Sequence, residues 1–204
     1  GRIARLLTAQ SRFGAELDSL ADNVSFGVAP ALILYLWSLQ ELPRLGWFAA
    51  LAFAIACALR LARFNARIDM ADEPRKEAGF LTGVPAPVGA GLVFLPMYLW
   101  FVSGLEPLRN PLLVSGWLVA MGFLLISSVA TLSWGKLRPR KHVRLEMIAF
   151  FGLVGAALLT EPWWTLVAIC AVYLAVLPVG VVMYWRIKRQ RAARPAPPQQ
   201  SGAA

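Results

Sequence analysis

Two aspartates near the start of the chain have the residue type and spacing of a metal site. Asp18 and Asp22 are four residues apart, and Gly14 precedes Asp18 at the same spacing. Residues four apart lie on one face of a helix, so the two carboxylates would point the same way. Carboxylate pairs suit Mg²⁺ or Mn²⁺, because these ions take oxygen ligands and share their coordination with water and substrate phosphate. The spacing therefore predicts a divalent-metal site for a phosphate-bearing substrate.

The surroundings of the two aspartates allow two interpretations. Both lie at the start of a long apolar stretch, where carboxylates are costly unless they are paired, hydrated or metal-bound. Arg5 and Arg12 favour a phosphate site, because guanidinium groups pair well with phosphate oxygens. The alternative is an ordinary helix end at the membrane surface, where Arg12, Glu16 and the aspartates form solvated ion pairs. Spacing alone leaves both open.

The elements that must position these aspartates are apolar helices. Of the 204 residues, 58% are hydrophobic and 15% are charged, which excludes an ordinary soluble domain. Most of the apolar stretches approach the ~20 residues that cross a bilayer as a helix. They cover about residues 16–40, 45–65, 86–104, 111–134, 146–160 and 163–185. We therefore expect an all-α, polytopic membrane bundle with about six transmembrane helices.

The basic residues predict how this bundle is oriented. If the helices alternate in direction, all of the 20 Lys and Arg residues except Arg44 and Arg109 fall on the side of the N-terminus. Lys and Arg accumulate in cytoplasmic loops, so we expect the aspartates to face the cytoplasm, in a bacterial inner membrane. The charge of +9 is thus explained by topology, and no nucleic-acid partner is expected.

The composition divides the chain into two parts. Residues 1–185 form the expected membrane domain, and residues 186–204 form a basic tail. The tail is rich in Arg, Pro, Gln and Ala and cannot bury a core, so we expect it to be disordered on the cytoplasmic surface. Cys57 and Cys170 lie within apolar runs, and we interpret both as packing residues.

The residues before the aspartates extend their spacing into a longer motif. The chain reads Gly1-Arg2-Ile3-Ala4-Arg5, eight residues, Gly14, three residues, Asp18, three residues and Asp22. This resembles the signature of the CDP-alcohol phosphatidyltransferase family, D-x-x-D-G-x-x-A-R-x(8)-G-x-x-x-D-x-x-x-D, and matches it from the motif glycine onward. The two aspartates before that glycine are absent, so we expect the chain to be a fragment that lacks the first helices of a longer protein.

The resemblance implies roles for individual residues. It implies that Asp18 and Asp22 bind Mg²⁺ or Mn²⁺ and that Asp22 is also the general base. It implies that Gly1, Arg5 and Ser11 hold the CDP-linked lipid substrate. It further implies a homodimer that is embedded in membrane lipid.

Three later segments bear on the acceptor alcohol. Residues 17–30, 58–65 and 83–87 resemble the family members that use serine. This implies transfer of a phosphatidyl group from CDP-diacylglycerol to L-serine, with release of CMP. Arg60, Arg63 and Asn65 are the candidates for binding the acceptor or a phosphate. The arginines are equally expected as simple membrane anchors, and the sequence leaves this open.

Two other functions remain as alternatives. A family member that uses glycerol phosphate or inositol phosphate would carry the same motif. A membrane ion or solute transporter could hold an ion between Asp18 and Asp22, but transporters typically have midplane sites between repeat-related halves. Here the carboxylates lie near one end of a predicted helix, and no internal repeat is visible.

Overall fold

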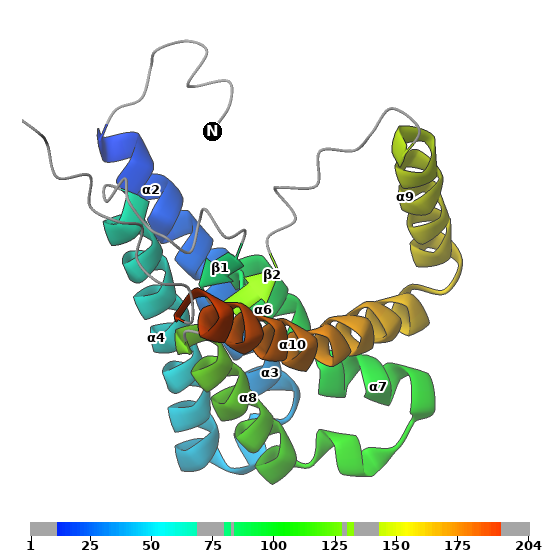
Figure 1. The fold of residues 1–204 in the computed structure, drawn as a ribbon. Coiled ribbons are helices and arrows are strands. Elements are labelled where there is room, and N and C mark those ends of the chain that lie inside the picture. Colours follow the sequence, from blue (N-terminus) through cyan, green and yellow to red (C-terminus); the bar gives the residue numbers. More distant parts are fainter. Residues whose placement is uncertain (1–11, 69–79, 83, 128–129, 133–142, 193–204) are drawn as a thin grey trace, which may run out of the picture.

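The computed structural model describes a helical membrane protein, with residues 12–68, 80–82, 84–127, 130–132 and 143–192 described (Figure 1). In chain order the elements are α2 (Arg12–Asn23), the π-helical segment η1 (Val24–Val28), α3 (Ala29–Trp37), the 3₁₀ turn η2 (Leu39–Glu41), α4 (Pro43–Ile68), β1 (Phe80–Thr82), α6 (Ala86–Val93), α7 (Leu95–Ser103), the 3₁₀ turn η3 (Glu106–Arg109), α8 (Pro111–Ile126), β2 (Ala130–Leu132), α9 (Val143–Thr160) and α10 (Pro162–Ala192). The predicted all-α class is confirmed, with one short pair of strands added.

Six apolar helical segments correspond to the six predicted stretches. Three are long and apolar enough to cross a membrane: Glu16–Trp37, Pro43–Ala66 and Ala86–Ser103. Three more are apolar but shorter: Pro111–Ile126, Glu146–Thr160 and Pro162–Pro178. The chain is therefore a polytopic membrane protein, as its composition predicted.

Proline, glycine and asparagine set the helix boundaries at the predicted turns. Pro43 and Pro162 open α4 and α10, where proline costs no intrahelical hydrogen bond. At the start of α8, the Leu112 N–H donates to the Asn110 side chain at 2.9 Å, an N-cap. Gly104, with a φ of 66°, ends α7 in a left-handed conformation that suits glycine. Local chemistry thus explains where the apolar segments stop.

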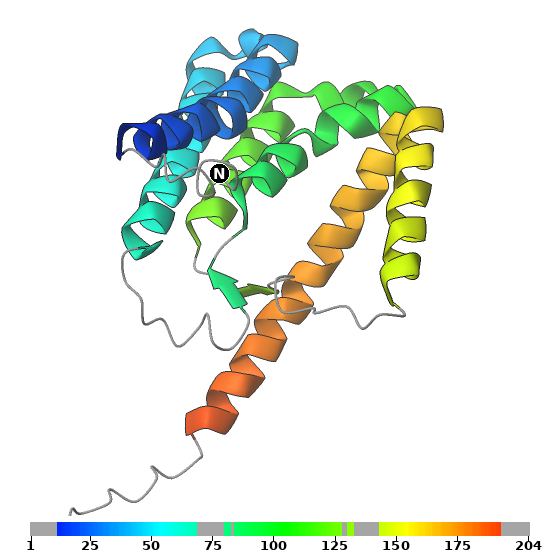
Figure 2. The same ribbon diagram turned by 90° about the horizontal axis from the view of Figure 1, so that it is seen from above.

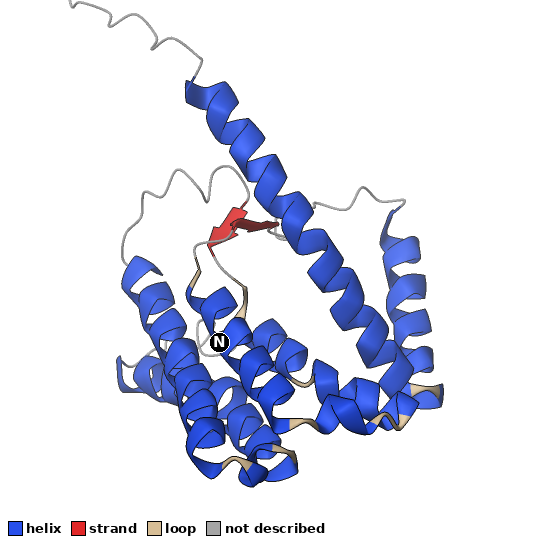
Figure 3. Cartoon of the chain, turned by 90° about the horizontal axis from the view of Figure 1, so that it is seen from below, coloured by secondary structure: helices blue, strands red, loops and turns tan. Residues whose placement is uncertain are grey.

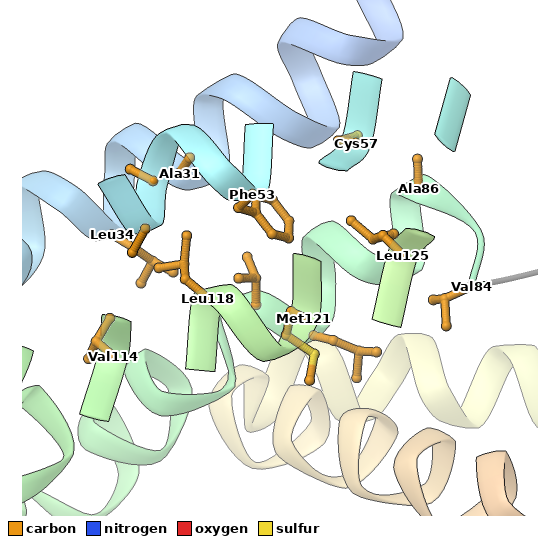
Figure 4. Packing of buried hydrophobic residues seen from close by; sticks show 14 of the residues in the cluster. Ala31, Leu34, Phe53, Cys57, Val84, Ala86, Val114, Leu118, Met121 and Leu125 are labelled. Carbon is orange, nitrogen blue, oxygen red and sulfur yellow. The ribbon is translucent and has the colours of Figure 1, made fainter. Parts of the chain in front are cut away.

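The core forms where α3, α4 and α8 meet. Phe53 of α4 is fully buried, and Figure 4 shows its ring among side chains of the other two helices, including Leu34 and Leu118. Gly122 of α8 lies against the α4 backbone, and a Cβ there would be 3.6 Å from Phe53 Cα. Cys57 and Cys170 are also buried, and both are free thiols, as interpreted from the sequence.

The end of the bundle that holds η2 and η3 is closed by hydrogen bonds and aromatic contacts between the helices. The Ser38 hydroxyl donates to the Arg109 carbonyl at 2.7 Å, and Arg109 Nε donates to the Trp37 carbonyl at 3.0 Å. Trp37 and Trp100 pack edge to face with centroids 5.9 Å apart. Clusters of tryptophan at helix ends are typical of a membrane–water interface.

Helix α10 joins the bundle through α7 and reaches the strands. Near its start, Trp163 stacks on Phe101 with ring centroids 4.4 Å apart. Figure 2 shows α10 as a long orange helix that runs past the strand pair, with α9 beside its first half. The helix continues to Ala192, past residue 186, where the basic tail was predicted to begin. Residues 193–204 lie outside the described residues, and their predicted disorder stays a prediction.

The strands β1 and β2 pair antiparallel, with Phe80 opposite Leu132 and Thr82 opposite Ala130 (red in Figure 3). They connect the segment after α4 with the segment after α8. Three-residue strands leave too short an alternation for sequence analysis to detect.

Close contact between η1 and α4 depends on Gly27. A Cβ built on Gly27 would lie 2.9 Å from the Cys57 Cβ and 3.0 Å from Asn23 Oδ1. The Cys57 Cβ is fixed to the backbone of α4 and cannot rotate away. Glycine therefore sets how closely the aspartate-bearing helix approaches α4.

We predict that Gly27→Ala lowers the free energy of unfolding by about 1–3 kcal/mol, because the added methyl group overpacks this contact. The control is Gly116→Ala, since Gly116 lies in a helix with nothing within 4 Å of an added Cβ. Alanine should leave stability there unchanged or slightly raised. Thermal denaturation in detergent measures both, and equal melting temperatures for the two variants would contradict the prediction.

Candidate active site

Asp18 and Asp22 lie on α2, one helical turn apart, as their spacing predicted. Asp18 is exposed and Asp22 is half-buried. Among the described side chains, none forms an ion pair with either carboxylate. The side chain of Arg12 is not described, so the ion-pair interpretation is tested only for the remaining partners. No described side chain therefore compensates the charge of either carboxylate.

The donor chemistry of the pair fits a divalent ion that also binds substrate. Mg²⁺ commonly uses one or two protein carboxylates and completes its shell with water and phosphate oxygens. Within the described ranges, no group of three or more His, Cys, Asp or Glu side chains gathers around one point. Asp18 and Asp22 would supply two carboxylates to such an ion, and water and phosphate oxygens would complete its shell.

A hydrogen bond between side chains ties the aspartate helix to α4. The Asn65 amide Nδ2 donates to Ser19 Oγ at 2.7 Å. Ser19 directly follows Asp18, so the bond fixes the turn of α2 that carries the carboxylates. The sequence offered Asn65 as an acceptor-binding residue, and the structure gives it this positioning contact.

The turn after Asp22 is π-helical rather than α-helical. Segment η1 begins at Val24, directly after Asn23. Single π-helical turns inside helices often accompany functional sites, because the extra residue changes where the flanking side chains point. Asn23 Oδ1 is buried, and no described group hydrogen-bonds it.

The two arginines of α4 have different surroundings. Arg63 is exposed, and its Nη1 donates to the Ile126 carbonyl at 2.9 Å, at the last residue of α8. Helix ends leave such carbonyls without intrahelical partners, so Arg63 caps α8. Arg60 is half-buried, and its Nε is buried with no hydrogen-bond partner among the described residues. Of the two arginines, Arg60 is therefore the one with a buried N–H that lacks a partner among the described residues.

Arg60 lies near residues of α4 and α10. Cys57, one turn earlier on α4, and Tyr173 of α10 are both within its electrostatic range. Cys57 in turn lies within range of the charge on Asp22. Sequence reasoning missed Tyr173, because no motif or spacing links a tyrosine in the last apolar stretch to an arginine of the second.

The residues expected to hold the CDP-linked lipid, Gly1, Arg5 and Ser11, lie outside the described residues. Of the predicted site residues, the structure brings Asp18, Asp22 and the three α4 candidates to one end of the bundle, which we call the polar end. It lies opposite the end closed by Arg109.

Comparison with known proteins agrees with this arrangement. The family model described as CDP-alcohol phosphatidyltransferase matches residues 1–132, and CDP-alcohol phosphatidyltransferase 2 matches residues 142–184. The first region contains the aspartates and the α4 candidates, and the second contains Tyr173.

Curated relatives carry one common name, CDP-diacylglycerol–serine O-phosphatidyltransferase. The protein of Mycobacterium tuberculosis H37Rv is 36% identical over 188 residues, which are 89% of this chain and 63% of that protein. The protein of Helicobacter pylori J99 is 35% identical, over 76% of this chain and 63% of that protein. The protein of Bacillus subtilis is 35% identical, over 63% of this chain and 64% of that protein.

The chain thus spans just under two thirds of the length of these relatives. Its motif spacing, its helical membrane fold and the family match over residues 1–132 agree, and the chain belongs to the CDP-alcohol phosphatidyltransferase family.

Proposed function

We propose that the protein transfers a phosphatidyl group from CDP-diacylglycerol to L-serine, which gives phosphatidylserine and CMP. The observation that carries this proposal is that two carboxylates and Arg60 lie at one end of the bundle. Among the described residues, the carboxylates have no ion-pair partner and the buried Arg60 Nε has no hydrogen-bond partner. Such a site offers both a metal-binding pair and an anion-binding cation. The name that the mycobacterial, Helicobacter and Bacillus relatives share supports serine as the acceptor.

Asp18 and Asp22 would hold Mg²⁺ or Mn²⁺. When bound, such an ion neutralises the diphosphate of the lipid substrate and stabilises charge on the transferring phosphoryl group and on departing CMP. The residues expected to bind the CDP part, Gly1, Arg5 and Ser11, remain those implied by the family motif.

Asp22 would also act as the general base. Asp22 is half-buried whereas Asp18 is exposed, which supports Asp22 as the base. Asp22 would accept the proton of the serine hydroxyl while that oxygen bonds to the phosphorus attached to diacylglycerol. The bond from this phosphorus to the CMP oxygen breaks, so CMP leaves as the phosphatidyl group is transferred.

Arg60 would bind an anionic group of a substrate, with the carboxylate of serine as the first choice. Arg63 would support the site indirectly, since it holds the end of α8 against α4. We further propose that the polar end faces the cytoplasm of a bacterial inner membrane and that two copies form a homodimer. The position of 18 of the 20 Lys and Arg residues in predicted cytoplasmic segments supports this orientation.

We predict that Asp22→Asn lowers turnover at least ~100-fold, because the amide neither accepts the proton nor balances a metal charge. Glu16→Gln is the matched control, an equivalent change at an exposed carboxylate of α2 outside the motif spacing. Release of CMP by the intact protein in detergent, with CDP-diacylglycerol and Mn²⁺, measures both. Near-normal turnover of Asp22→Asn would remove this residue from catalysis.

We predict that Arg60→Gln raises the KM for serine about 10-fold or more, since a hydrogen bond to a charged group contributes about 1.5–3 kcal/mol. Arg63→Gln should instead lower thermal stability and change the KM less. Initial rates over a serine series, together with melting curves, separate the two effects. A larger KM change in Arg63→Gln would reverse the assignment.

The acceptor itself is tested by supplying labelled serine and labelled glycerol phosphate separately to the intact protein with CDP-diacylglycerol. We expect label to enter lipid from serine alone, with CMP released. Incorporation from glycerol phosphate alone would keep the family chemistry and refute serine as the acceptor.

A further inference from the structure

Three buried polar atoms at the polar half of the bundle have no hydrogen-bond partner among the described residues: Asn23 Oδ1, Arg60 Nε and the Tyr173 hydroxyl. They come from three different helices. An unpaired polar group in a membrane bundle is costly, because neither lipid nor apolar side chains can satisfy it. Native proteins leave few such groups, so three near one site require an explanation.

The three side chains belong to one neighbourhood. Arg60 lies within electrostatic range of both Cys57 and Tyr173. The side chains of Cys57 and Asn23 both lie against Gly27, at 2.9 and 3.0 Å from the position of an added Cβ. Asn23, Cys57, Arg60 and Tyr173 therefore form a continuous cluster from α2 through α4 to α10.

The donors in this cluster match an oxyanion. A guanidinium N–H and a phenol O–H both donate, and the guanidinium adds a positive charge. Within the described part of the chain, no carboxylate is ion-paired with Arg60. A carboxylate or phosphate oxygen that accepts from both groups would satisfy both and neutralise the charge.

The packing of α10 fixes the position of Tyr173. Cys170 lies three residues before Tyr173, on the same helical face, and is buried. Its Sγ lies 3.7 Å from the Gly91 carbonyl of α6, which marks a close approach of the two helices. The face of α10 that contacts α6 at Cys170 is therefore the face that carries Tyr173.

We propose that Tyr173 and Arg60 form one oxyanion-binding subsite, so that α10 contributes a substrate-binding residue to the transfer reaction. The subsite rests on the proposed function. Its ligand is an anionic oxygen group, either the carboxylate of the acceptor or a phosphate of the CDP-linked lipid. Asn23 lies at the edge of the same cluster, but its unpaired atom is the acceptor Oδ1, so the oxyanion subsite consists of Arg60 and Tyr173 alone.

The test is Tyr173→Phe in the intact protein, a change that removes only the hydroxyl. We expect the KM for one substrate to rise about 10-fold, the size of a lost hydrogen bond to a charged group, with kcat changed less. The melting temperature should stay the same or rise, because the variant buries no unpaired hydroxyl. Tyr98→Phe is the control, since Tyr98 is also half-buried and packs near α10 but next to Trp163.

Two series distinguish the ligands, one with serine varied and one with CDP-diacylglycerol varied. A rise confined to serine assigns the carboxylate, and a rise confined to the lipid assigns its phosphate. The double variant Arg60→Gln, Tyr173→Phe should lose less binding free energy, calculated from KM, than the sum of the two single variants. The reason is that both side chains act on one ligand group. Unchanged KM values for both substrates, or full additivity, would overturn the subsite.

The subsite and the proposed function fail in different ways. If the wild type transfers to another alcohol and not to serine, the function is wrong, while the same comparison with that alcohol still decides the subsite. Thermal stabilisation by CDP-diacylglycerol and by each alcohol gives a second readout that needs no turnover. Equal stabilisation of wild type and Tyr173→Phe by every substrate would refute the subsite.

Discussion

The structure depends on the cost of placing charged groups inside an apolar bundle. Asp18 and Asp22 lie at the first turns of a segment that is long and apolar enough to cross the membrane. Carboxylates there are tolerated when they stay near the surface or gain a cation. The helix must therefore hold them at one end, in a fixed position, while the rest of the same helix packs into the core. Most features of the polar end satisfy this double requirement.

Two contacts hold the aspartate helix against α4. The hydrogen bond from Asn65 to Ser19 fixes it within the carboxylate turn, and Gly27 lets the helix approach Cys57 closely one turn later. The π-helical segment begins between these contacts, at Val24, and contains Gly27, so the change of helical phase follows closely after the carboxylates. The polar face and the packing face of one continuous segment can then point in different directions.

The sequence predicted the parts of this arrangement that depend on local spacing and composition. Six apolar segments, their Pro and Gly boundaries and the shared face of Asp18 and Asp22 follow from periodicity and turn chemistry. The Asn65–Ser19 bond, the β1–β2 pair and the approach of Tyr173 to Arg60 depend on how distant segments pack. A single sequence carries no signal for such pairings, because each partner has an ordinary local context. The 186–192 extension of α10 was missed because the basic composition there predicts disorder, whereas helix formation continued from the apolar part.

The different environments of Arg60 and Arg63 show how one helix end can serve two purposes. Residues three apart lie on neighbouring positions of a helix, yet one guanidinium reaches outward to the Ile126 carbonyl and the other points into the bundle. The outer arginine joins the end of α4 to the end of α8 and so supports the site. The inner one has no ion-pair partner among the described residues, and the phenol of Tyr173, within its electrostatic range, brings no carboxylate to it. A carboxylate partner in place of Tyr173 would have neutralised Arg60 and removed its affinity for substrate. A phenol leaves the positive charge in place and adds a directional donor, the combination that the proposed oxyanion subsite requires.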